Sequence, residues 1–131
     1  MVLSNCIEPA LSAMEIYEKQ PFLTAGETDL NLATAYVNCA ELYQERKDYE
    51  NAIAFFTKAL SIEQRILGEF HVNTASSYLS MASVLQEAQD FEEAQNMFEK
   101  AVHIYEDEYG PDHEITKDVR SRYLDNLAKW T

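Results

Sequence analysis

The chain has 131 residues, of which 47% are hydrophobic and 25% are charged, and this composition fits one soluble globular domain with a continuous core. Its formal net charge of −13 argues against nucleic acid and anionic membranes as partners, because both attract Lys and Arg. No apolar run approaches the roughly 20 residues of a membrane span, so membrane insertion is not expected either.

The first predicted element is a helix over residues 5–20. Apolar residues recur there at helical spacing, and these are Ile7, Leu11, Met14 and Tyr17. Pro21 ends this helix, because proline cannot continue the backbone hydrogen bonds. We expect a loop from there to Thr28.

A pair of helices follows. The apolar residues of 29–46 and 49–67 fall at i, i+3 and i+4 steps, and a short turn at Lys47 separates the two segments. Gly68 comes directly after the second helix, where glycine permits the left-handed conformation that commonly ends a helix. The sequence therefore predicts an antiparallel helical hairpin.

The next segment repeats this plan. Helices are predicted over 71–88 and 91–109, with a stop at Gly110 and Pro111, and a last helix is predicted over 112–130.

An internal repeat underlies these elements. Shifting the sequence by 42 residues aligns fifteen identical residues over positions 33–74, and a fixed period of this kind indicates stacked helical units. We therefore expect a single all-α domain made of a half repeat at 5–26, full repeats at 29–68 and 71–110, and a capping helix at 112–130.

Small and large side chains alternate in the same order in both full repeats. The residues concerned are Tyr36, Ala40, Ala52, Phe56 and Ala59, and then Tyr78, Ala82, Ala94, Phe98 and Ala101. In this order the chain resembles the tetratricopeptide repeat family, and its 42-residue spacing is similar to the long variety found in kinesin light chains. The resemblance implies a right-handed α-α superhelix of about six antiparallel helices, in which these residues pack the helices together.

The resemblance also implies a function, since the first helix of each unit lines a concave wall that binds a peptide or helix of a partner protein. Carried over by position, this wall comprises Thr34, Val37, Asn38, Glu41, Gln44 and Glu45, then Ser76, Leu79, Ser80, Ser83, Gln86 and Glu87, and then Ser121, Arg122 and Asp125.

The wall predicts a basic or amphipathic ligand. Family members that hold acidic peptide ends have Lys or Asn where this chain has Val37, Glu41 and Ser80. Here the carboxylates of Glu41, Glu45 and Glu87 would instead attract Lys or Arg.

No catalytic motif or cofactor site stands out, so we expect a binding protein and not an enzyme. His71 and His113 each lack a second metal ligand at i+4, and their recurrence favours a role in starting helices. Cys39 occupies a core position, where packing is favoured over catalysis. The alternative function is self-assembly, as a homodimer or stack, through terminal helices that lack a partner.

The two cysteines, Cys6 and Cys39, show neither metal-ligand nor disulfide-framework spacing, which favours a reducing compartment. The N-terminus also lacks the pattern of a signal peptide. A cytoplasmic location is therefore predicted, with cytoskeletal, ciliary and nuclear pools left open.

Overall fold

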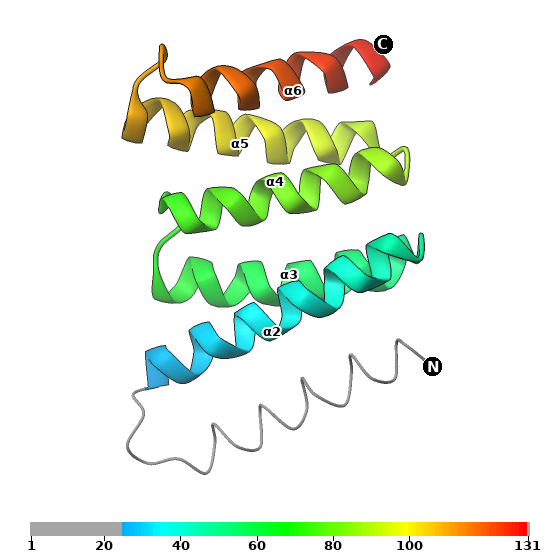
Figure 1. Ribbon diagram of the computed structural model, residues 1–131, viewed down its shortest axis with the longest axis vertical. Helices are drawn as coiled ribbons and strands as arrows, with labels where there is room; N and C mark the ends of the chain where they lie inside the picture. The colour runs from blue at the N-terminus through cyan, green and yellow to red at the C-terminus, as the bar shows by residue number, and fades with distance from the viewer. Residues whose placement is uncertain (1–24, 131) are drawn as a thin grey trace. The chain divides into compact units, whose positions relative to one another are not determined.

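Residues 25–130 are described by a computed structural model of the protein, and they form five helices with no strand among them (Figure 1). The prediction of an all-α fold is confirmed for this part of the chain. The chain divides into two compact units, of which the first ends at Ile66 and the second begins at Leu67. The predicted helix over 5–20 lies outside the described residues.

The first unit contains α2 (Ala25–Glu45) and α3 (Tyr49–Ile66), which pack as an antiparallel hairpin (Figure 1). The predicted loop to Thr28 is wrong, because α2 already begins at Ala25. One glycine in a helix costs about 1 kcal/mol relative to alanine, so Gly26 does not prevent the helix from forming. Asp29 lies inside α2 and accepts a hydrogen bond from Arg65 of α3 at 2.9 Å.

Small residues of α2 and α3 lie in the interior of the protein. Ala40, Ala52 and Ala59 are fully buried, and Phe56 is only 1% exposed. A methyl side chain lets two helices approach closely, and the large ring of Phe56 then fills the remaining space. The alternation of small and large residues in the sequence thus corresponds to a close-packed interior.

Tyr36 is the exception among the residues that the sequence assigns to packing, because it is only half-buried. Its ring lies 5.8 Å from the ring of Phe55, and the amine of Lys58 lies 5.6 Å from its centroid. An ammonium group keeps contact with water, so this cation–π contact belongs at the edge of the unit.

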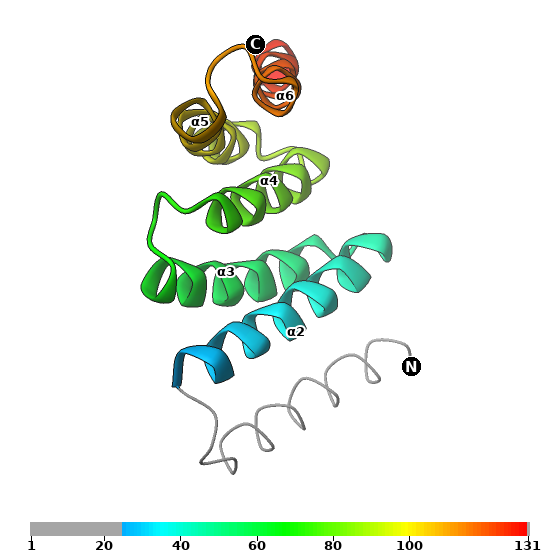
Figure 2. The same cartoon turned by 60° about the vertical axis from the view of Figure 1, so that its left-hand side comes forward.

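The second unit contains α4 (Val72–Glu87), α5 (Phe91–Tyr109) and α6 (Glu114–Trp130), and α5 packs against both of the others (Figure 2). Its core contains the residues that the sequence assigns to packing, namely Tyr78, Ala82, Ala94, Phe98 and Ala101, all at most 2% exposed. Tyr78 is therefore fully buried, whereas its equivalent Tyr36 in the first unit is only half-buried.

The two hairpin turns share one hydrogen-bond pattern. After α2, the Asp48 N–H donates to the carbonyl of Tyr43, and the Lys47 N–H donates to the carbonyl of Gln44, both at 2.9 Å. These two bonds make a Schellman motif, which needs a left-handed residue after the helix. Lys47 has φ 62°, and Gln89, the equivalent residue after α4, has φ 67°.

Histidines begin α4 and α6 in the same way. The imidazole Nδ1 of His71 accepts a hydrogen bond from the Asn73 N–H at 3.0 Å, and Nδ1 of His113 accepts one from the Ile115 N–H at 3.1 Å. The first N–H groups of a helix have no partner within the helix, so each histidine satisfies one of them. Their recurrence in the sequence therefore reflects helix capping.

A buried amide network joins the three helices of the second unit. Asn126 of α6 is fully buried, and its Nδ2 donates to the carbonyl of Phe91 at 3.0 Å and to Oε1 of Gln95 at 2.7 Å. Its Oδ1 accepts a hydrogen bond from Gln86 of α4 at 3.3 Å. Buried polar groups are costly unless they are bonded, so the network favours this one placement of α6.

Cys39 is 3% exposed and packs against Ala35, Leu42 and Phe55. Its sulfur is disulfide-bonded, whereas the sequence predicted only a packing role. A disulfide is uncommon in a reducing compartment, so this bond does not support the predicted cytoplasmic location.

Candidate protein-binding surface

One face of α2 presents most of the residues predicted for its part of the binding wall. Thr34, Asn38, Glu41 and Glu45 are exposed and follow one another at steps of four, three and four residues, which places them on a single stripe. Val37 and Gln44 lie beside that stripe and are half-buried. We call these six residues the α2 face.

The α2 face is negatively charged. Within the described residues, no Lys or Arg lies within ion-pair distance of the carboxylates of Glu41 or Glu45. The Thr34 hydroxyl donates to the carbonyl of Leu30 at 3.1 Å and so remains close to the helix. Both carboxylates are therefore open to a cation from a partner.

The corresponding face of α4 is smaller and less charged. Ser76 and Glu87 are exposed, and Leu79, Ser80 and Ser83 are half-buried. The Ser80 hydroxyl donates to the carbonyl of Ser76 at 3.2 Å. Short side chains leave room for another backbone to approach, and Leu79 adds apolar surface. We call these five residues the α4 face.

Two other residues predicted for the wall are engaged in contacts within their own unit. The Gln86 amide, which the sequence also assigns to the wall, donates to Oδ1 of Asn126 at 3.3 Å. Arg122 forms an ion pair with Asp118, one turn earlier in α6, at 3.4 Å. Because an exposed ion pair of this kind is weak, Arg122 remains able to exchange partners. A partner that takes the same N–H group of Gln86 would compete with its bond to Asn126.

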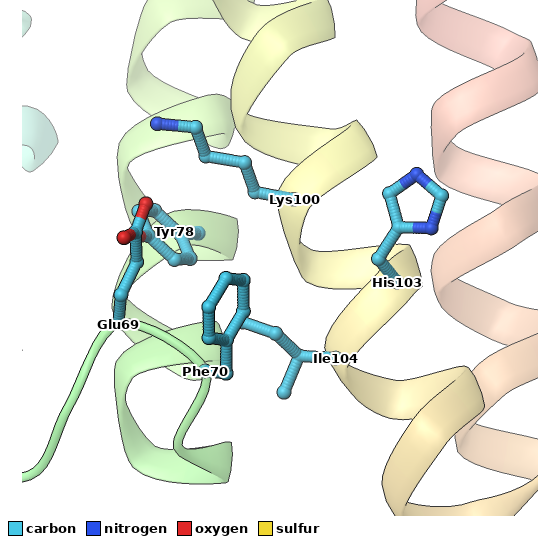
Figure 3. Close-up of a pocket in the computed structure, with 6 residues that line it drawn as sticks. All are labelled: Glu69, Phe70, Tyr78, Lys100, His103 and Ile104. Carbon is cyan, nitrogen blue, oxygen red and sulfur yellow. The ribbon is translucent and has the colours of Figure 1, made fainter.

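The structure also contains a pocket that the sequence did not indicate. It has a volume of about 140 Å³, lies beside α4 and α5, and is lined by Glu69, Phe70, Tyr78, Lys100, His103 and Ile104 (Figure 3). Phe70 is 78% exposed, more than any other large apolar side chain among the described residues. The equivalent residue one repeat earlier is Thr28, so a residue-by-residue comparison of the two repeats would have singled out Phe70.

Lys100 bounds this pocket on one side. Its side chain extends over Tyr78, with the amine 5.4 Å from the ring centroid, and Phe70 lies beside Ile104 (Figure 3). Lys58 has the same relation to Tyr36 one repeat earlier. The lysine contact is therefore part of the repeat, and Phe70 is what distinguishes this pocket.

Two buried tyrosines have shifted acidities. Burial, followed by the nearby Asp48 carboxylate, raises the pKa of Tyr43. Burial and, to a smaller extent, Tyr109 raise the pKa of Tyr105, and Arg122 partly opposes this rise. Both effects keep the hydroxyl protonated and suit packing residues.

Within residues 25–130, no group of three or more His, Cys, Asp or Glu side chains is placed to hold a metal ion. Nor does any helix in this range have the length and apolar character needed to cross a membrane.

A family model described as Tetratricopeptide repeat matches residues 31–107 of the chain and, in a second alignment, residues 78–129. The two matches together run from within α2 to the end of α6 but for its last residue, and they include all of α3, α4 and α5. No curated protein matches the chain.

Proposed function

Because the chain belongs to the tetratricopeptide repeat family, whose repeats generally mediate protein–protein interactions, we propose that it is a non-enzymatic scaffold. The α2 face and the α4 face each bind a peptide or helix of a partner protein. The observation that carries this proposal is the exposed stripe on α2, where the Glu41 and Glu45 carboxylates lack a cation among the described residues.

The chemistry of the two faces sets the class of partner. On the α2 face, Glu41 and Glu45 attract Lys or Arg, and Val37 offers apolar contact beside them. On the α4 face, Glu87 and Leu79 offer the same two kinds of contact. A basic or amphipathic segment satisfies both features. The short serine side chains of α4 allow the backbone of the bound segment to approach closely.

Two finer points belong to the same proposal. The 42-residue spacing supports a likeness to the long repeats of kinesin light chains. A cytoplasmic location is proposed from the cysteine pattern of the sequence, with cytoskeletal, ciliary and nuclear pools left open, and cell fractionation tests it. Recovery from an oxidising compartment would agree instead with the disulfide at Cys39.

Affinity capture with the whole chain tests the binding faces. Wild-type protein is compared with the variant Glu41→Lys/Glu87→Lys and with a control, Asp107→Lys/Glu108→Lys, which changes the net charge equally on exposed positions of α5. We expect the wild type and the control to retain the same proteins, and the first variant to lose them.

Retention of the same proteins by all three forms would contradict the proposed faces. Equal loss by both variants would show that only net charge matters. Circular dichroism of each variant verifies that the helices are intact.

Self-assembly is a second candidate, because α6 exposes large apolar side chains. Leu124 is 54% exposed and Trp130 is 47% exposed. The net charge of −13 opposes the approach of two copies, so we rank this candidate second. Sedimentation at several concentrations tests it, since a species that remains monomeric throughout excludes it.

A further inference from the structure

A groove runs between α5 and α6, and none of the residues that line it belongs to the α2 face or the α4 face. It has a volume of about 290 Å³, and its apolar lining comes from Val102, Tyr123 and Leu124. Charged side chains bound it, including Glu99 of α5 and the pair of Glu106 and Arg120. All of these residues belong to the second unit.

The repeat shows why the apolar part of this groove is unusual. Leu124 occupies the position on α6 that Ala82 occupies on α4, one repeat earlier. Ala82 is fully buried, whereas Leu124 is 54% exposed. Packing within the described residues therefore does not explain a large apolar side chain at this position, and exposed apolar surface beside charged residues often marks an interaction site.

The charges in the groove favour a cation. Arg120 donates a hydrogen bond to Glu106 at 2.8 Å, and it lies 3.4 Å from the carbonyl of Pro111, so its charge is already satisfied. Glu99 is exposed, and the only ion pair found for it among the described residues is with His103 at 3.9 Å. Lys100, the one Lys or Arg on α5, extends over Tyr78 instead.

We propose that this groove docks an amphipathic, basic helix of a partner protein. Its apolar face covers Leu124 and Val102, and its Lys or Arg side chains face Glu99. At the position of Leu124, the preceding repeat has the small Ala82. The larger leucine side chain leaves less space for a neighbouring helix, so the docking helix needs a small residue opposite Leu124. A second copy of this chain is the poorer occupant, because its net charge of −13 matches the sign of Glu99.

The test uses a labelled synthetic helix of about 18 residues, with leucine and alanine on one face and lysine on the other. One twin replaces the leucines by serine, and a second twin replaces the lysines by glutamate. Fluorescence anisotropy with the whole chain gives each Kd. The protein variants are Leu124→Ser and Glu99→Lys, with Ile115→Ser and Glu108→Lys as matched controls on the same two helices.

We expect the leucine–lysine helix to bind about tenfold more tightly than either twin. Leu124→Ser and Glu99→Lys should each weaken its binding about tenfold, and the controls should leave it within about twofold. Equal binding of the serine twin, or an equal loss in the controls, would overturn the proposal. Self-association of the chain that Leu124→Ser abolishes would also overturn it, because the occupant would then be a second copy.

Discussion

His71 and His113 show how one residue type serves one role at two helix starts. Each uses Nδ1 to accept a backbone N–H two residues ahead, at 3.0 and 3.1 Å. An imidazole nitrogen accepts a hydrogen bond only when it carries no proton, and in both histidines the accepting nitrogen is Nδ1. This requirement separates the capping histidines from the exposed His103, which pairs only loosely with Glu99.

Replacing either capping histidine by alanine leaves one N–H of the first helical turn without its partner. We expect His71→Ala and His113→Ala each to lower the free energy of unfolding by about 1 kcal/mol. Asparagine at the same positions should retain most of this stabilisation, because its side chain can also cap the helix. Urea denaturation of the four single variants measures this. An asparagine variant no more stable than its alanine counterpart would contradict the capping role.

Tyr43 and Tyr105 make the stability of the fold depend on pH in the alkaline range. Their pKa values are raised in the folded chain, chiefly by burial, so the unfolded chain loses these protons at a lower pH than the folded chain does. The resulting stabilisation of the protonated fold is fully present below the unfolded pKa of about 10, and it is lost as the pH rises through the folded values.

We therefore expect the wild type to lose stability above a pH of about 10, and the variant Tyr43→Phe/Tyr105→Phe to lose less over the same range. Thermal melting as a function of pH, with the near-ultraviolet absorbance of tyrosinate recorded in parallel, measures both. An identical alkaline decline in the two proteins would assign it to other groups.

At the scale of elements, the two hairpin turns carry a conformational cost. Lys47 and Gln89 adopt the left-handed conformation with φ 62° and 67°, which costs a non-glycine residue about 1–2 kcal/mol. Glycine avoids this cost, but it lowers the free energy of unfolding by about 0.5–1 kcal/mol because it gives the unfolded chain more conformational freedom. The net effect of glycine at either position should be stabilising.

We expect Lys47→Gly and Gln89→Gly each to raise the free energy of unfolding by about 0.5–1 kcal/mol. Ala88→Gly serves as the control, because Ala88 has a right-handed backbone with φ −76° and glycine there only adds freedom to the unfolded chain. Calorimetric melting distinguishes them. A lower melting temperature for both turn variants would contradict the assigned conformation.

The helices and their turns could be predicted from the sequence, because apolar spacing and a 42-residue repeat specify them directly. The start of α2 could not, since Gly26 gives only a weak stop signal and the cross-helix bond of Asp29 to Arg65 depends on the fold. The hydrogen bond from Gln86 to Asn126 joins residues 40 positions apart in the sequence, and no local sequence pattern reveals it. The exposure of Phe70 likewise depends on which neighbours the fold provides.

At the scale of the whole molecule, electrostatics sets the class of ligand. The chain has 23 acidic residues against 10 Lys and Arg, so its field attracts basic segments and speeds their encounter. Net charge alone does not give specificity. Specificity comes from the places where exposed carboxylates lie beside apolar side chains. The α2 face with Val37 and the α5–α6 groove with Leu124 are two such places.

Binding at the α2 and α4 faces is tested by the salt dependence of the affinity for a partner segment recovered by capture. We expect its Kd with the wild type to rise steeply with ionic strength, because screening weakens contacts with Glu41 and Glu87. Glu41→Lys/Glu87→Lys should bind more weakly at low salt and show a flatter dependence, while Asp107→Lys/Glu108→Lys should follow the wild type. Identical Kd values and salt slopes for all three proteins would contradict binding at the α2 and α4 faces.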